Sequence, residues 1–377
     1  MSTHPSTTVP ATTREVLYRL TLQRPVHDQL LREGFADAFA VADPALRGAL
    51  LASILTGLIA KGATVDEVIT LVDVVIGLDG WTLDRRVRLH DGGGPTLVGV
   101  KGSGKKGVKT INVSTPSCLL AAAAGAAVAK IGSSGTASYP GSLEFAAQVG
   151  INVDLDHAAM AGVLRATSFA YVNTELTYVR FVSLYKGIFH VPHALIFGWS
   201  VLLPVHCDVL FYGVAHPDVD LSLKVARHFG IRDGTAVSCT DDGLHYLDEM
   251  GISGTTYTCA MRGGEVAAVQ ALDTARELDL PRYNLSDLRE QGSLRGNVDV
   301  VVQALSGRGS PAHRDVLCVN AAEILVLGGV VGTRAEGFAR ARACVAAGAV
   351  IDKLREIVKA SGGSMDRLES YLTRHAG

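Results

Sequence analysis

A stretch without carboxylates, Lys101–Ser142, most constrains what this chain can fold into. It contains no Asp or Glu, whereas glycines, hydroxyl residues and five lysines are concentrated in it. A short apolar strand is expected just before it at Leu97–Val100, and a helix within it at Pro116–Ala129, with Thr115 as the N-cap. Backbone N–H groups at glycines and at a helix start can hold a phosphate together with lysine ammonium groups. The stretch therefore predicts a strand, an anion-binding loop and a helix in succession.

Apolar segments of strand length alternate with amphipathic segments of helical length through the rest of the chain. This alternation favours an α/β fold with a mostly parallel central sheet. Strands are expected at Leu97–Val100, Val128–Lys130, Ala170–Val172, Val209–Gly213, Thr235–Cys239 and Glu265–Ala268. Helices are expected at Ser142–Val149, Asp218–Phe229, Leu285–Glu290, Val298–Ser306, Pro311–Gly328, Arg334–Ala346 and Ala349–Lys359.

The first part of the chain differs, because its apolar residues recur at helical spacing. Asp43-Pro44 and Thr64 are typical helix starts, and residues 176–203 are also apolar enough for helices. The fold class is therefore α/β, with a small N-terminal helical domain and a larger α/β domain around a mostly parallel central sheet. The expected units are a flexible tail over 1–24, a helical domain over 25–90 plus about 174–200, and an α/β domain over 95–173 and 201–377.

Charge and cysteine usage exclude several classes of function. The formal net charge is −2, which argues against bulk nucleic-acid binding because that needs a basic surface. Six cysteines occur without a C-x-x-C pair, as expected of thiols in a reducing compartment. The apolar runs Cys118–Ala129 and Ala194–Val205 are too short to span a membrane. We expect a soluble cytoplasmic protein without a membrane or nucleic-acid partner.

Two nucleotide-binding motifs are only formally present. Gly102–Gly107 matches G-x-G-x-x-G, but a dinucleotide fold also needs an acidic residue about 20 residues later, and none occurs before Glu144. Gly99–Lys106 approaches the P-loop pattern, yet Lys106 stands where the magnesium-binding hydroxyl belongs. The glycine loop therefore indicates neither a dinucleotide site nor a nucleoside triphosphatase.

A longer constellation fits a phosphoribosyl site better. Residues 102–115 read Gly-Ser-Gly-x-x-x-x-Lys-Thr-x-Asn-x-Ser-Thr, and Lys130-x-Gly132, Ser138 and Gly141-Ser142 follow. This pattern resembles the phosphoribosyl diphosphate (PRPP) site of the anthranilate phosphoribosyltransferases. The resemblance covers roughly residues 26–358, including Lys61–Glu67 in the helical part, Leu247–Gly254 with its Asp-Glu pair, and Val319–Ala322 in a late helix.

The resemblance implies a glycosyltransferase that uses PRPP and forms a homodimer through its helical domain. The implied donor-binding residues are Gly102, Ser103, Gly104, Lys105, Lys106, Lys109, Thr110, Asn112, Ser114, Thr115, Lys130, Ser133 and Ser142. The implied metal ligands are Asp248, Glu249 and Ser114, whose hard oxygen atoms suit Mg²⁺.

This chain departs from the family pattern in both halves of the site. Lys105-Lys106 stand where the family has Gly-Asp, and Lys130–Ser134 replaces its Lys-His-Gly-Asn-Arg. The family's acceptor arginine maps near Lys186, and its polar segment reads here as the apolar Ile196–Pro204. The loss of a bidentate carboxylate clamp argues against anthranilate as the acceptor. Acceptor contacts are expected from Lys186, His190, His193 and Tyr171.

We therefore expect a transferase that moves a (phospho)ribosyl group from PRPP to a small acceptor other than anthranilate and releases pyrophosphate. Two alternatives stay open at this point. One is a nucleoside-phosphorylase-like enzyme, in which the extra lysines would hold free phosphate. The other is a non-catalytic relative that binds polyanions through the lysines between Lys101 and Lys109.

Overall fold

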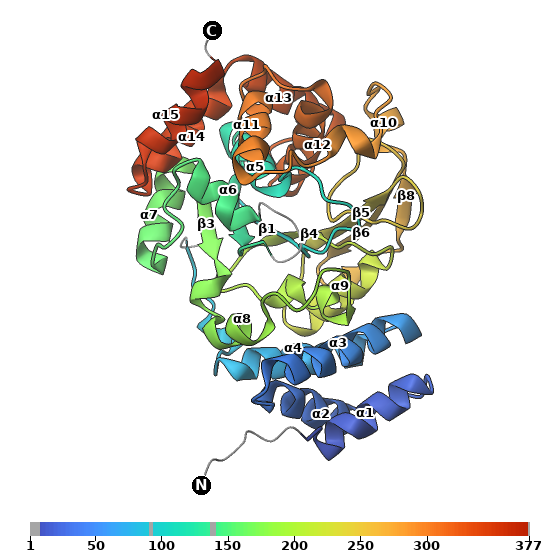
Figure 1. Cartoon of the computed structure of the whole chain (residues 1–377). Coiled ribbons are helices and arrows are strands. Elements are labelled where there is room, and N and C mark those ends of the chain that lie inside the picture. The colour runs from blue at the N-terminus through green and yellow to red at the C-terminus, as the bar shows by residue number, and fades with distance from the viewer. Residues whose placement is uncertain (1–7, 90–92, 136–140, 376–377) are drawn as a thin grey trace.

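A twisted, mostly parallel sheet forms the centre of the computed structural model, which describes residues 8–89, 93–135 and 141–375 (Figure 1). Its strands are β1 (Leu97–Gly102), β2 (Ala127–Gly132), β3 (Phe169–Asn173), β4 (Val209–Gly213), β5 (Gly234–Thr240), β6 (Thr255–Arg262), β7 (Glu265–Val266) and β8 (Gln270–Leu272). The order is β3-β2-β1-β4-β5-β6-β7, with β8 also paired to β6. Strands β1 to β5 pair in parallel and β6 to β8 are antiparallel. The predicted α/β fold is confirmed.

The two faces of the sheet belong to two separate hydrophobic clusters, because side chains alternate along each strand. Ala127, Ala129 and Ile131 of β2 join the cluster that includes the N-terminal helices and α9 (Val219–His228). Val128 of the same strand joins the cluster built by the later helices. These are α5 (Ser114–Ala123), α6 (Ser142–Gln148), α11 (Leu294–Leu305), α12 (Pro311–Leu327), α13 (Arg334–Ala346), α14 (Ala349–Ala360) and α15 (Met365–Leu372). Strand β2 is buried along its whole length, as parallel strands with two covered faces are.

Helices α1 (Ala11–Thr21), α2 (Asp28–Ala40), α3 (Pro44–Lys61) and α4 (Val65–Leu78) form a separate bundle at the N-terminal end of the molecule (Figure 1). The flexible tail expected over 1–24 is wrong for α1. Its Val16 and Leu20, one helical turn apart, are buried against the bundle, and Thr13 donates to the carbonyl of Gly34 at 2.8 Å. The Ser, Thr and Pro residues at the start of the chain indicated a flexible tail, and the apolar stripe of α1 was therefore not recognised.

One helix of the bundle satisfies a length and composition test for a membrane span. Within the described residues, α3 alone is long and apolar enough to cross a membrane. Its Leu51, Ile54 and Leu55 are fully buried inside the bundle, while 28% of the whole 18-residue window is buried.

Residues 174–203 form shorter pieces than the expected helices. They are the 3₁₀ turns Thr174–Leu176, Ala194–Phe197 and Trp199–Val201, and the short helix α8 (Val179–Tyr185). Gly187 has a positive φ of 84° just after α8, which breaks the helical path before Pro192. Segment α8 lies between the N-terminal bundle and the sheet (Figure 1).

The helix after the glycine loop begins earlier than expected. Helix α5 spans Ser114–Ala123, so Thr115 is inside it and is not its N-cap. The N-cap position is Val113, and the Oδ1 of Asn112 just before it accepts the N–H of Thr115 at 3.3 Å. Five further helices and strands lack a counterpart in the sequence predictions: β6, β8, α7 (His157–Thr167), α10 (Thr274–Glu277) and α15.

Candidate active site

A cleft opens at the carboxyl ends of β1 and β2, next to α8, and encloses about 1160 Å³, part of it open to solvent. Strands β2 and β3 lie on one side of β1, and the chain then crosses to the other side of β1 to form β4 and β5. Ligands of open α/β sheets bind at such a switch point, here between β1 and β4. Most residues predicted for the site line it: Gly102, Ser103, Gly104, Lys105, Lys106, Thr110, Asn112, Ser114, Lys130, Ser133, Ser142, Lys186, Asp248 and Glu249.

Five predicted residues do not line this cleft. Lys109 is exposed on the glycine loop, and Thr115 is buried inside α5. Tyr171 is buried behind the cleft, where its hydroxyl shares a 3.1 Å hydrogen bond with Ser142. His193 is fully buried and hydrogen-bonds to the hydroxyl of Tyr185, while His190 is exposed. The acceptor role predicted for these two histidines therefore has no support in the geometry. Ser138 lies outside the described residues.

The carboxylate of Asp248 is fixed against the glycine loop. Its Oδ2 accepts the backbone N–H of Gly104 at 2.7 Å and the hydroxyl of Ser103 at 3.2 Å. Two paired glycines at the ends of β1 and β4, Gly102 and Gly213, make room for it. A Cβ at Gly102 would lie 2.8 Å from Oδ2, and one at Gly213 would lie under 3.0 Å from the Asp248 carbonyl oxygen. The sequence predicted Gly102 as a site residue. It did not reveal the role of Gly213, because Asp248, for which this glycine makes room, is far away in the chain.

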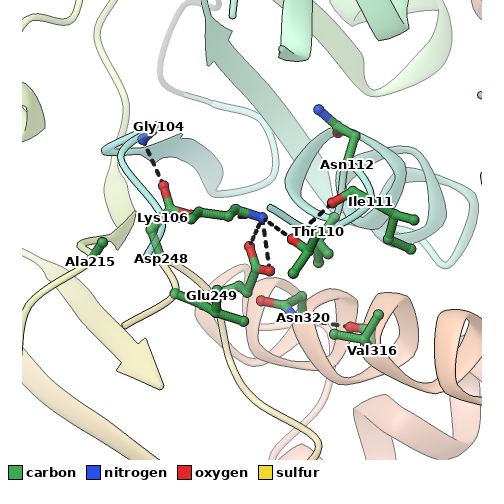
Figure 2. Close-up of polar contacts among 12 residues, drawn as sticks. Gly104, Lys106, Thr110, Ile111, Asn112, Ala215, Asp248, Glu249, Val316 and Asn320 are labelled. Carbon is green, nitrogen blue, oxygen red and sulfur yellow. Dashed lines mark hydrogen bonds and ion pairs between the residues drawn. The ribbon is translucent and has the colours of Figure 1, made fainter. Parts of the chain in front are cut away.

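Lys106 reaches across the loop to the acidic pair that the sequence assigned to metal (Figure 2). Its Nζ lies 2.6 Å from Oε2 of Glu249 and 3.8 Å from Oδ1 of Asp248. It also donates to the Thr110 hydroxyl at 2.9 Å. Burial favours the neutral amine, but the two carboxylates outweigh this and raise the pKa of Lys106. The lysine is therefore held as an ammonium ion.

Asn320 of α12 lies near Glu249, where its Nδ2 also donates to the Val316 carbonyl of its own helix (Figure 2), and it holds the backbone of the residue that follows the acidic pair. Its Oδ1 accepts the N–H of Met250 at 3.0 Å, and its Nδ2 donates to the Met250 carbonyl at 3.0 Å. This reciprocal pair fixes the backbone immediately after Glu249. The sequence singled out Asn320 only by resemblance, and the structure supplies its physical role.

A divalent cation does not fit the acidic pair in this arrangement. Both Glu249 oxygens accept from Lys106, and Oδ2 of Asp248 accepts from the glycine loop. Mg²⁺ would need these oxygens and would stand beside an ammonium ion. The prediction of Mg²⁺ at Asp248, Glu249 and Ser114 is therefore not supported by these contacts.

Three further lysines bring buried positive charge to the cleft. Lys101 donates to the carbonyl of Leu202 at 2.7 Å, Lys105 to that of Phe189 at 2.7 Å, and Lys130 to that of Ile131 at 2.9 Å. Burial lowers the pKa of Lys101 to about 7, with smaller effects of neighbouring Lys130 and Arg86, and lowers that of Lys105 to about 8. A bound anion would stabilise these ammonium ions.

The loop after β2 differs from the expected phosphate cradle. The backbone N–H and hydroxyl of Ser134 both donate to Glu175, with an N···O distance of 2.8 Å. The N–H of Gly135 donates to Glu144 at 3.0 Å. These backbone groups are thus engaged by carboxylates of the chain itself. Anion binding in this cleft has to depend mainly on lysine and hydroxyl side chains.

An aromatic wall completes the cleft on the side of α8. It consists of Tyr178, Phe181, Tyr185 and Trp199, of which Tyr178, Phe181 and Trp199 were not predicted as site residues. Lys105 lies over the Tyr185 ring at 5.7 Å, and Lys101 lies over the Trp199 ring at 6.0 Å. The hydroxyl of Tyr178 is buried without a hydrogen-bond partner among the described residues. Helical spacing of Tyr178, Phe181 and Tyr185 was the only signal in the sequence.

Binding of pyrophosphate is expected to take up protons at pH 8. The anion would raise the depressed pKa values of Lys101 and Lys105, so affinity should fall as the pH rises from 7 towards 10. Calorimetry in two buffers of different ionisation enthalpy should show uptake of about one proton beyond that of the ligand itself. Lys101→Met should reduce this uptake. Equal apparent enthalpies in both buffers would contradict the assignment.

The chain matches a family model and curated relatives over most of its length. Residues 94–351 match the family model described as the α/β domain of the glycosyl transferase family. The anthranilate phosphoribosyltransferase of Pelotomaculum thermopropionicum is 30% identical over 336 residues, which cover 86% of this chain and 92% of that protein. The one from Shewanella baltica is 28% identical over 354 residues, covering 89% and 93%.

Solved structures show the same fold. Anthranilate phosphoribosyltransferase from Thermus thermophilus superposes with a TM-score of 0.71 at 21% identity, covering 92% of this chain and 99% of that one. The Saccharomyces cerevisiae enzyme in complex with PRPP and Mg superposes with a TM-score of 0.73 at 18% identity, covering 93% and 98%.

Proposed function

The chain belongs to the glycosyl transferase family and resembles its anthranilate phosphoribosyltransferases, and on that premise we propose that it transfers a (phospho)ribosyl group from PRPP to a small acceptor other than anthranilate. Pyrophosphate is the leaving group. The observation that carries the proposal is a single cleft that joins buried lysines at the ends of β1 and β2 to an aromatic wall. One half suits a diphosphate, and the other suits a planar acceptor.

The lysines of the cleft would hold the donor. Five lysines and three carboxylates line it, so positive charge is in excess once a bound anion has stabilised the ammonium forms of the buried lysines. Hydroxyl and amide groups of Ser114, Ser142 and Asn112 line the same region and would donate to phosphate oxygens. As C1 of the sugar becomes oxocarbenium-like, the lysines would stabilise the charge gathering on the departing pyrophosphate. The chain then contributes position and charge, without a protein nucleophile.

The acceptor would lie along the aromatic wall beside Glu175. This carboxylate is held by Ser134 and lies 3.7 Å from Lys186, and both charged residues line the cleft. Glu175 would accept the proton that the attacking group of the acceptor loses. The Tyr178 hydroxyl, buried without a partner among the described residues, is a candidate contact for a polar atom of the acceptor.

The residues that line the cleft support a change of acceptor relative to the family. Neither arginine nor histidine is among the described residues that line the cleft, so a bidentate guanidinium clamp for a ring carboxylate is lacking. Lys186, which maps near the family's arginine, is already engaged with Glu175. An acceptor without a carboxylate clamp, such as an aromatic amine, phenol or nitrogen heterocycle, suits these contacts better.

The two alternative functions are less well supported. A polyanion such as nucleic acid needs an exposed basic surface, but Lys101, Lys105 and Lys130 are 9%, 1% and 2% exposed. A nucleoside-phosphorylase-like reaction would use the same lysines for free phosphate, so ligand binding has to separate it from the proposed transfer.

Three further properties are part of the proposal. Magnesium accompanies PRPP in the yeast structure, but we assign no step to a metal in this chain, because its acidic pair is engaged by Lys106. Exposed Tyr18 and Leu22 on the N-terminal bundle support a homodimer through that bundle. A reducing cytoplasmic location agrees with six cysteines that are all free.

Thermal stabilisation by candidate ligands tests the proposal. PRPP at about 100 times its Kd should stabilise the fold by about 2.7 kcal/mol, whereas phosphate with nucleosides and single-stranded DNA should not. Pyrophosphate release with a panel of aromatic amines, phenols and heterocycles would then identify the acceptor class. Stabilisation by nucleoside and phosphate but not by PRPP would favour the phosphorylase, and anthranilate as the best acceptor would refute the altered specificity.

A further inference from the structure

We infer that the Lys106 ammonium group takes the place of a divalent cation at Asp248 and Glu249, so that this chain binds its diphosphate ligand without a metal at that pair. The inference rests on the proposed function, since the diphosphate is part of the proposed donor. It concerns a position at which the family pattern has aspartate and this chain has the opposite charge.

The hydrogen bonds and ion pairs described for the Lys106 ammonium all lie inside the cluster. An ammonium ion has three N–H groups, and three acceptor side chains surround this one (Figure 2). They are Glu249 at 2.6 and 2.9 Å, Thr110 at 2.9 Å, and Asp248 at the longer distance of 3.8 Å. The lysine is therefore an integral part of the acidic pair and not a surface charge passing near it.

Burial makes this arrangement persistent. The side chains of Lys106, Asp248 and Glu249 are 12%, 5% and 3% exposed. Removing the ammonium would leave two carboxylates close together in a poorly hydrated place, which is strongly destabilising. A divalent cation would have to displace Lys106 or lie beside it, and both are unfavourable. The pair is thus occupied by the chain's own cation.

The diphosphate must then find its countercharge elsewhere in the cleft. One ammonium neutralises one of the two carboxylates, whereas Mg²⁺ would neutralise both and still bridge to phosphate oxygens. Lys101 and Lys130 supply the missing charge, since their ammonium groups donate only to backbone carbonyls in the contacts described above. Lys105 stands next to Lys106 in the glycine loop, where the family pattern has a glycine. It adds a third cation to the cleft.

Calorimetry with inorganic pyrophosphate and with PRPP tests the metal-free mode. The wild-type chain should bind both with a Kd in EDTA within about threefold of that in Mg²⁺, a difference below 1 kcal/mol. Binding that weakens by about 100-fold or more in EDTA would overturn the inference. If neither ligand binds in either buffer, the proposed function fails, and the cation measurement below alone decides the role of Lys106.

Mn²⁺ titration followed by electron paramagnetic resonance tests the cation site without any substrate. The wild-type chain should leave Mn²⁺ free, and Lys106→Ala should create one site that Glu249→Gln, added to it, abolishes. Lys109→Ala is the matched control, because it removes an exposed lysine from the same loop and should behave as wild type. If the wild-type chain bound one Mn²⁺ and the Glu249→Gln variant did not, the inference would be overturned. This comparison does not depend on whether Lys106→Ala folds.

Discussion

Lys106→Met is expected to destabilise the folded chain by about 3–5 kcal/mol, because it leaves Asp248 and Glu249 buried without their cation. Methionine keeps the length of the side chain, so the loss reflects charge more than volume. The raised pKa of Lys106 keeps its contribution present below the ordinary lysine value of 10.5. That contribution should fade only as the pH rises through the higher folded value. Urea unfolding at pH 7.5 measures the effect through the midpoint and slope.

Two variants serve as controls for this result. Lys109→Met, on the exposed side of the same loop, should change stability by no more than about 0.5 kcal/mol. Lys106→Met combined with Glu249→Met should recover part of the loss, because the double variant buries one unpaired carboxylate instead of two. A single variant as stable as the wild type would show that the ion pair is not the buried contact described here.

Gly213→Ala is expected to have an equally large effect, more than about 4 kcal/mol, for a steric reason. The added Cβ would meet the backbone carbonyl of Asp248 well inside van der Waals contact, and neither β4 nor the acidic segment has room to move. The segment is fixed from the other side by Asn320. Soluble yield, the urea midpoint and pyrophosphate binding report the damage, and any folded fraction should have lost its ligand affinity.

Gly162→Ala provides the matched comparison. This glycine lies in the interior of α7, and a Cβ there would meet nothing within 4 Å. Alanine is the better helix former, so the variant should be more stable by about 0.5–1 kcal/mol. If Gly213→Ala were tolerated as well as Gly162→Ala, the close approach of Asp248 to β4 would be wrong.

The elements of the α/β region were predictable because their signals are local. Val209–Gly213 and Arg334–Ala346 were predicted with their observed ends, since turn residues, caps and apolar periodicity lie within each segment. The N-terminal α1 was missed although Val16 and Leu20 are correctly spaced, because the polar residues before them dominated the composition. The helices expected over residues 176–203 are replaced by short pieces, because the apolar residues there pack into the core without forming regular helices.

The sequence by itself determined the residue types of the site and the order in which they occur along the chain. A glycine loop with lysines, a helix start and an acidic pair all follow from local composition, and the parallel sheet brings strand ends together. Only the tertiary structure decided what those groups do. Lys106 and Glu249 are 143 positions apart, and no local pattern shows that their charges meet at 2.6 Å. Because Coulomb interactions depend on distance and burial, the tertiary structure turned a predicted metal site into an ion pair.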